Sequence, residues 1–282
     1  MIEKQIDSSK VSVLLPCYKS ADLLRSDVWR IAYSMFRNTL PRKEVILYDN
    51  GGNDGVLQEI QKWMPNLVKV IGDGENIGLN AALNACAKEA TGWYYYLPHT
   101  DMIPDYDALA KLVAHAKHLP PGSFLFCSRS IERTKGHTPF HIIKDLGGLE
   151  ELKQDNYKTE LWEALHNASH KLTVVTGYRM PFFLDRHLWK KMNGVDENLF
   201  SYATDNDLFL SAYDVGVRRF WMINGSMVYH LQGQSNAQQT VDRDSDKPYQ
   251  YLREKWAKKG YNTAQHIDHL EQSLIPWNLH VS

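Results

Sequence analysis

Residues 11–18 read VSVLLPCY, an apolar run of β-type residues that contains a proline near its end. Runs of the same kind recur at 44–50 (EVILYDN), 67–73 (LVKVIGD) and 93–98 (WYYYLP). An amphipathic or alanine-rich segment separates each run from the next. Short apolar runs that alternate with helical segments at this spacing are typical of βαβ units. We therefore predict an α/β fold in which these four strands are parallel and end at one edge of the sheet.

The rest of the chain has a more mixed pattern. A long polar stretch at 131–170 indicates a loop or small insertion. The remaining expected elements are strands at 123–130 and 171–177, helices at 183–193, 205–216 and about 246–260, and a strand–turn–strand unit at 221–230.

Composition places the protein among ordinary globular chains. It has 282 residues and a formal net charge of -1, which argues against a strong overall field for nucleic acid or anionic lipid. No apolar run approaches the roughly 18 residues that span a bilayer, and the charged start lacks the apolar core of a secretory signal. Cys17, Cys86 and Cys127 are widely spaced, so we expect reduced thiols and a cytoplasmic protein.

Polar or turn-forming residues follow each of the first four predicted strands. Taken singly, any of them is explained by turn chemistry. Their coincidence at one sheet edge favours a ligand site, because ligands of open α/β sheets collect beyond the carboxyl ends of the strands. These residues are Pro16 and Tyr18, Asp49 and Asn50, Asn76 and Gly78, and His99, Thr100 and Asp101.

Four acidic or imidazole positions have two readings each. Asp101 either holds a divalent cation against a diphosphate or caps a helix that starts near residue 104. Asp205 and Asp207 lie at the start of a predicted helix, where they either complement the helix dipole or supply a general base. A lone histidine such as His230 is usually structural, and it becomes a metal ligand only if folding brings it to Asp101.

Taken in order, these segments resemble the inverting family 2 glycosyltransferases with the GT-A fold, including rhamnosyltransferase-like members. The resemblance runs from about residue 11 to 236. It implies a Rossmann-like, mostly parallel sheet flanked by helices, with a C-terminal helical tail. It also implies a nucleotide-sugar-binding half at 1–101, an acceptor and catalytic half of the same domain at 102–235, and a helical extension at 236–282.

The resemblance also assigns roles to individual residues. Asp205 matches the catalytic base, while Asp101 and His230 match ligands of Mn²⁺ or Mg²⁺. Two positions depart from the family pattern, because His99 and Thr204 stand where acids are usual. The residues expected to bind the nucleotide sugar are Pro16, Tyr18, Asp49, Asn50, Asn76, Gly78, Asn84, His99 and Gly177.

The implied partners are a nucleotide-diphosphate sugar, of uridine or deoxythymidine, and a glycan or other hydroxyl acceptor, as in polysaccharide biosynthesis. We expect 131–170 and the tail after 236 to shape the acceptor site, with Tyr157, Trp162 or Trp256 able to stack on sugar rings.

Three alternatives stay open. Two locally basic stretches, one of them around Arg253 and Lys258, raise a nucleic-acid acceptor as a less favoured class. The two departures from the family pattern raise a relative that binds a nucleotide sugar or glycan without transferring it. A nucleotidyltransferase would need a basic triphosphate-binding loop near the first strand, and the sequence there has none.

Overall fold

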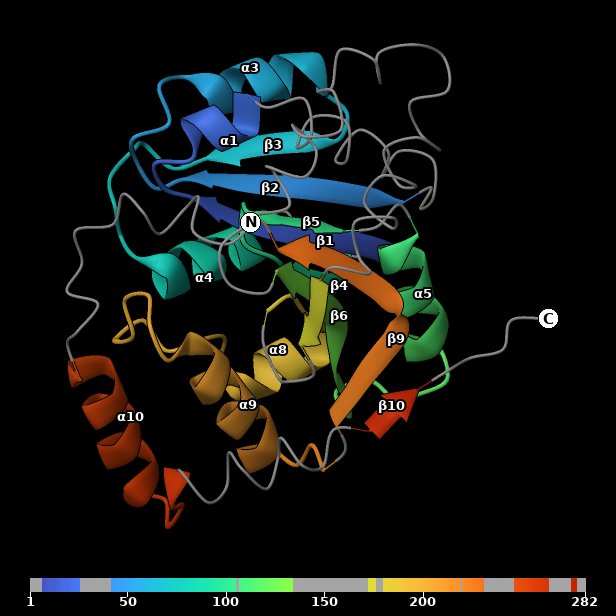
Figure 1. The fold of residues 1–282 in the computed structure, drawn as a ribbon, viewed down its shortest axis with the longest axis vertical. Coiled ribbons are helices and arrows are strands. Elements are labelled where there is room, and N and C mark those ends of the chain that lie inside the picture. The colour runs from blue at the N-terminus through green and yellow to red at the C-terminus, as the bar shows by residue number, and fades with distance from the viewer. Residues whose placement is uncertain are drawn as a thin grey trace.

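A computed structural model describes residues 7–25, 42–104, 107–133, 172–175, 180–218, 220–230, 246–263 and 275–277. Its helices lie on both faces of a single sheet (Figure 1). The strands are β1 (Asp7–Cys17), β2 (Lys43–Asp49), β3 (Val68–Ile71), β4 (Gly92–Leu97), β5 (Met102–Pro104), β6 (Leu125–Arg133), β7 (Leu172–Val175), β8 (Phe182–Asp185), β9 (Phe220–His230) and β10 (Ile275–Trp277). The helices are α1 (Ala21–Arg25), α3 (Val56–Trp63), α4 (Leu79–Glu89), α5 (Ala108–Ala116), α8 (Arg186–Met192), α9 (Thr204–Asp214) and α10 (Lys247–Ala257).

The sheet order is β10-β9-β6-β8-β4-β1-β2-β3, with β5 paired to β9 and β7 paired to β6. β1 runs parallel to both β2 and β4, and β2 runs parallel to β3. The four parallel strands predicted from the first hundred residues are therefore confirmed. Their carboxyl ends meet at one edge, where the polar residues that follow each strand gather.

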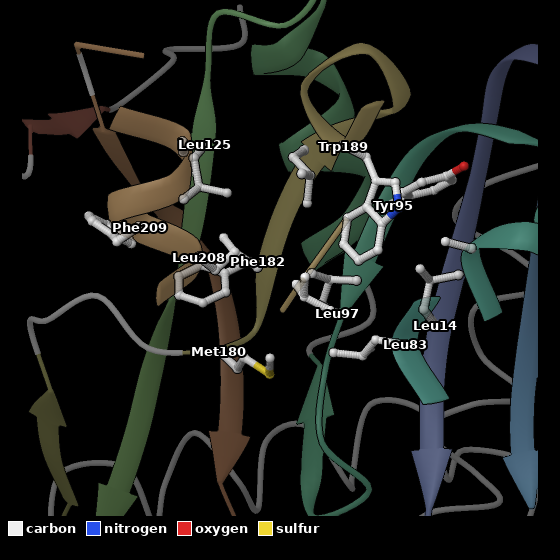
Figure 2. Packing of buried hydrophobic residues seen from close by; sticks show 14 of the residues in the cluster. Leu14, Leu83, Tyr95, Leu97, Leu125, Met180, Phe182, Trp189, Leu208 and Phe209 are labelled. Carbon is white, nitrogen blue, oxygen red and sulfur yellow. The ribbon is translucent and has the colours of Figure 1, made fainter. Parts of the chain in front are cut away.

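Alternating side chains of the central strands build two separate cores. On β4, Tyr94 and Tyr96 face the core under α1, α3 and α5, whereas Tyr95 and Leu97 face the core under α4, α8, α9 and α10. Figure 2 shows the second core, where Tyr95 lies near Trp189 and Phe182 near Phe209. A strand buried on both faces has apolar residues at successive positions, which explains the continuous apolar runs of the sequence.

The predicted helix at 183–193 is wrong at its start. Phe182–Asp185 is a strand that runs antiparallel to both β4 and β6, and the helix begins only at Arg186. Asp185 is the N-cap, because its carboxylate accepts a hydrogen bond from the Leu188 amide at 2.9 Å. A short, fully buried apolar run has no periodicity that separates a strand from a helix.

The predicted strand–turn–strand unit at 221–230 is also wrong. β9 is one strand, and the register with β6 shifts between the pairs Ser128–Ile223 and Arg129–Met227. The Asn-Gly step at 224–225, which resembles a hairpin turn, is instead accommodated within a bulged strand.

The two proposed halves share one continuous sheet, since β4 from the first pairs with β8 from the second. Beyond residue 236 the expected helix is present as α10, but the tail also returns to the sheet through β10, which pairs with β9. The stretch 134–171 lies outside the described residues, as do Tyr157 and Trp162. Cys17 and Cys86 are free and buried. None of the described helices has both the length and the apolar character needed to cross a bilayer.

Candidate functional site

A cavity of about 270 Å³ opens where β1, β2 and β4 end. Its wall combines these strand ends with the start of α4, the segment before α9, the first turn of α9 and one residue of α10. Seven of the predicted site residues line it. The lining comprises Pro16, Tyr18, Ser20, Asn50, Asn76, Gly78, Leu79, His99, Thr100, Phe200, Ser201, Tyr202, Ala203, Thr204, Asp205, Asn206 and Tyr249.

The loops after β1 and β2 are held together by the buried side chain of Asn53. Its amide nitrogen donates to Asp49 Oδ1 at 2.8 Å and to the Cys17 carbonyl at 2.9 Å. Its amide oxygen accepts from the Ser20 backbone nitrogen at 3.1 Å. Asn53 therefore positions two walls of the cavity at once. The sequence did not reveal this role, because the Gly-Gly-Asn-Asp run has the composition of an ordinary turn.

The end of β2 presents Asp49 and Asn50 in different ways. Asn50 lines the cavity and is buried, and its side-chain oxygen accepts from the Ile77 amide at 2.9 Å. Asp49 lies beside the cavity lining, with Oδ1 bonded to the Gly51 amide and to Asn53. Within the described residues, Asp49 Oδ2 has no hydrogen-bond partner, so this oxygen remains available to a ligand.

At Gly78 the backbone lies directly against the segment before α9. Its φ is +87°, and a Cβ atom there would lie 2.7 Å from Phe200 Cδ2 and 2.8 Å from the Phe200 carbonyl oxygen. The Asn76 side chain accepts from the Gly78 amide at 3.1 Å and fixes this turn. Any larger residue at 78 would have both an unfavourable φ and a steric clash. The close contact joins two distant parts of the chain at the cavity.

The segment after β4 brings three predicted site residues together. His99 and Thr100 line the cavity, and Asp101, the next residue, is outside the lining with 1% of its surface exposed. β5 then pairs with β9 so that Met102 lies opposite His230. The backbone of residue 230 is thus one position from that of Asp101 in the sheet register, despite a separation of more than one hundred residues in sequence. The side chain of His230 lies outside the described residues.

Of the acids at 196–207, only Asp205 lines the cavity. It lies in the first turn of α9. Asp207 is buried two residues later, where its Oδ1 accepts from Lys255 Nζ at 2.7 Å and from Trp256 Nε1 at 2.8 Å. Asp196 is bonded to Lys255 at 2.9 Å. Asp196 and Asp207 therefore fasten α10 to the body of the protein, which leaves Asp205 as the acid that faces the cavity.

Asn84 has a structural role in this arrangement. Its amide nitrogen donates to the Val195 carbonyl at 2.9 Å and to Glu197 Oε1 at 2.8 Å, and its oxygen accepts from the Val195 amide at 3.1 Å. It lies outside the lining of this cavity, and its expected contact with the nucleotide sugar stays a prediction. Gly177, another expected ligand, lies outside the described residues.

Thr204, one of the two departures from the family pattern, links α9 to α4. Its hydroxyl donates to Asn80 Oδ1 at 2.9 Å, and Asn80 in turn donates to the Asp196 carbonyl at 2.7 Å. Thr204 is buried as well as lining the cavity. These bonds fix the first turn of the helix that carries Asp205.

Several cavity residues were not predicted from the sequence. They come from the aromatic segment before α9, from the first turn of α9 and from α10, namely Phe200, Ser201, Tyr202, Asn206 and Tyr249. The aromatic flanks of the acidic stretch were the one available signal at 200–202. Nothing in the sequence distinguishes Tyr249 from other tyrosines, because its position depends on how α10 docks.

The backbone of His230 lies one register position from that of Asp101, and carboxylate and imidazole are groups that fit Mn²⁺ or Mg²⁺. Among the described side chains, no three His, Cys, Asp or Glu residues gather tightly enough to hold a metal, and the His230 imidazole is not among them. The described cavity lining contains no lysine or arginine.

The fold and the strand-end cavity define an α/β protein of the GT-A type, and comparison with solved structures agrees. S. aureus TarS 1-349 in complex with UDP-GlcNAc superimposes with a TM-score of 0.57 at 17% identity, over 86% of this chain and 64% of that one. TarS 1-349 in complex with UDP gives 0.53 at 16% identity, over 78% and 60%. The mannosyltransferase PcManGT from Pyrobaculum calidifontis, in complex with GDP-Man and Mn2+, gives 0.51 at 16% identity, over 82% and 59%.

The model of the family "Glycosyl transferase family 2" matches residues 12–204. This chain therefore belongs to glycosyl transferase family 2. It spans about three fifths of the length of the TarS 1-349 and PcManGT chains. No curated protein matches it significantly.

Proposed function

We propose that this protein transfers a sugar from a nucleotide-diphosphate sugar to the hydroxyl group of a glycan, with inversion at the anomeric carbon. The observation that carries the proposal is the single cavity in which the ends of β1, β2 and β4 meet Asp205 from α9. Family membership over residues 12–204 supports the same chemistry. In this proposal the donor lies across the strand ends and the acceptor approaches from α9.

The donor's nucleoside is assigned to the end of β2. The Asp49 Oδ2 atom is available to the base or ribose, and Asn50 lines the neighbouring wall. Pro16 and Tyr18 extend this wall from β1, and the turn at Asn76 and Gly78 lets the backbone approach the ligand closely. Gly177 is assigned to the donor site on the basis of the family resemblance alone.

Asp101 and His230 are the proposed ligands of Mn²⁺ or Mg²⁺, with His99 near the same diphosphate. When bound, such a cation supplies Lewis-acid stabilisation of the charge on the leaving diphosphate. The absence of lysine and arginine from the described lining supports this assignment, since a diphosphate needs a positive partner. Imidazole at position 99 in place of a carboxylate reduces the negative charge of the site.

Asp205 is the proposed general base. Its carboxylate takes the proton of the acceptor hydroxyl as that oxygen forms a bond to the anomeric carbon. The bond from the anomeric carbon to the donor phosphate oxygen breaks, and the nucleoside diphosphate leaves with the electron pair. Because the attack comes from the face opposite the leaving group, a single displacement inverts the anomeric centre.

A screen of nucleotide sugars tests the function directly. We expect one of UDP-glucose, UDP-GlcNAc, GDP-mannose or a deoxythymidine diphosphate sugar to raise the melting temperature in the presence of Mn²⁺. A ligand that binds only the native state at 100 times its Kd stabilises it by about 2.7 kcal/mol. The same donor should slowly release nucleoside diphosphate. Stabilisation without any release would indicate a binding protein, and stabilisation by none of them would contradict the proposal.

The second basic stretch gives little support to a nucleic-acid acceptor. Arg253 pairs with Asp246, Lys255 with Asp196 and Asp207, and Lys259 with Asp214. Most of the positive charge of this stretch is therefore balanced by neighbouring carboxylates. A glycan acceptor agrees better with this surface.

A further inference from the structure

Exposed aromatic side chains are concentrated at the cavity. Within the described residues, the large apolar side chains with high exposure are Trp63, Phe200 and Tyr249, at 50%, 43% and 40% of their surface. Phe200 and Tyr249 both line the cavity, whereas Trp63 lies on α3 outside it. Solvent-exposed apolar rings that gather in one concave site are typical of a ligand surface.

Tyr249 is presented by a firmly anchored helix. Leu252 and Trp256 follow it at spacings of three and seven residues, so all three share one stripe of α10. Leu252 and Trp256 are buried, and the Trp256 indole donates to Asp207 at 2.8 Å. Trp256 thus cannot stack on a sugar, contrary to the expectation from the sequence. It holds in place the helix that carries Tyr249 to the cavity.

The segment that carries Phe200 also contains two buried hydroxyl groups without partners among the described residues. The hydroxyl groups of Ser201 and Tyr202 are buried and have no hydrogen-bond partner within the described part of the chain. Leaving such a group unpaired costs about 1–3 kcal/mol.

We propose that Phe200 and Tyr249 form an acceptor subsite that stacks on an uncharged pyranose ring beside Asp205. The inference rests on the proposed function and goes further by naming the acceptor class and the residues that select it. A pyranose has an apolar C–H face that fits an aromatic ring. The described lining has no lysine or arginine, which disfavours an anionic acceptor such as a uronate.

The location of Tyr249 separates this subsite from the donor site. The family match ends at residue 204, so α10 lies outside the part of the chain that the family model covers. The residues assigned to the donor's nucleoside, at the ends of β1 and β2, lie within that part. Because α10 contributes to the cavity wall from outside the family match, we assign this part of the wall to the acceptor, the substrate that varies between relatives.

Saturation-transfer difference NMR on the intact protein with Mn²⁺ and the best nucleoside diphosphate tests the subsite. The probes are methyl glycosides of glucose, galactose, mannose and N-acetylglucosamine, together with methyl glucuronide. We expect at least one neutral glycoside to receive saturation at its ring C–H protons, more strongly than the glucuronide does. Its affinity should fall roughly tenfold in Tyr249→Ala, the loss expected for one aromatic contact.

Two matched variants complete the test. Tyr249→Trp keeps an aromatic face and should retain binding, and Trp63→Ala removes the exposed ring that lies outside the cavity and should leave binding unchanged. Equal affinity in Tyr249→Ala and wild type, or the absence of any neutral glycoside signal while the nucleotide still binds, would overturn the subsite alone. If the nucleotide also fails to bind, the result would contradict the proposed function as well as the subsite.

Discussion

Asp205 is the residue on which the proposed chemistry depends most. We expect Asp205→Asn to lower turnover by about 10²–10⁴-fold, the usual contribution of general-base assistance. Donor affinity should change little, because the carboxylate acts on the acceptor hydroxyl. Steady-state kinetics together with donor titration measure the two effects separately.

Asp214 on the same helix provides the control for Asp205. Its carboxylate pairs with Lys259 and Tyr261, outside the cavity lining. Asp214→Asn should therefore keep its turnover. Near-normal turnover in Asp205→Asn would assign the base to another group.

Asp101 should affect the donor through a cation. We expect Asp101→Asn, which preserves the size of this buried side chain, to weaken donor binding at least tenfold with Mn²⁺ present, since one lost carboxylate ligand is worth more than the 1.4 kcal/mol of a tenfold change. Donor binding measured after chelation of the metal should be the same in both proteins. Isothermal titration calorimetry gives both values, and an unchanged affinity in Mn²⁺ would remove Asp101 from the cation site.

At the residue scale the sequence predicted positions better than roles. Asp205, Asn50 and His99 line one cavity, as the strand-end argument implies. Asn84 lies in the sequence segment expected at the donor site, but its side-chain amide is hydrogen-bonded to the backbone of Val195. A side-chain amide uses the same atoms to bind a ligand or to hydrogen-bond a backbone turn, so residue type alone does not distinguish these two roles.

Among the helices and strands, α10 is the one whose contacts most clearly change the pKa values of the residues that hold it. Burial opposes ionisation of Asp196, but hydrogen bonds from Lys255, the Asn198 amide and Tyr251 together lower its pKa to about 2. Asp207 is more deeply buried, and its burial raises its pKa in spite of Lys255. Asp196 is therefore the carboxylate whose ionised form stabilises the docked helix.

This difference makes the stability of the protein depend on pH in a defined direction. The pKa of Asp196 is lower in the folded state, so its contribution is full above the unfolded value near 4 and is lost as the pH falls through about 2. We expect Asp196→Asn to reduce the free energy of unfolding at pH 6, with the difference shrinking below pH 4. Urea denaturation across this range measures it, and a constant difference down to pH 2 would contradict the assignment.

Among the elements, the sequence was least informative where burial is complete. The strand Phe182–Asp185 has no exposed face, so its pattern matches a buried helix equally well. The helix starts at Arg186 because Asp185 caps it, and the sequence pattern alone did not identify Asp185 as a cap. The Asn-Gly step in β9 has the composition of a turn, but pairing of β9 with β6, β5 and β10 holds it in a strand.

For the whole molecule, the fold was predictable because the apolar runs and helices alternate regularly over the first hundred residues. Parallel pairing of β1, β2, β3 and β4 follows from that order. The remainder depends on contacts between distant segments, which no local pattern encodes. The pairing of Met102 with His230 and the contact of Gly78 with Phe200 are both of this kind.

The central claim is that one edge of the sheet collects these distant segments around a nucleotide-diphosphate sugar. The most direct measurement is a crystal structure of the protein grown with Mn²⁺ and the nucleoside diphosphate that stabilises it best. The account predicts density for the nucleotide along the ends of β1 and β2, with its diphosphate beside residues 99–101 and a cation between Asp101 and His230. Nucleotide bound elsewhere on the molecule, with this cavity filled only by solvent, would contradict it.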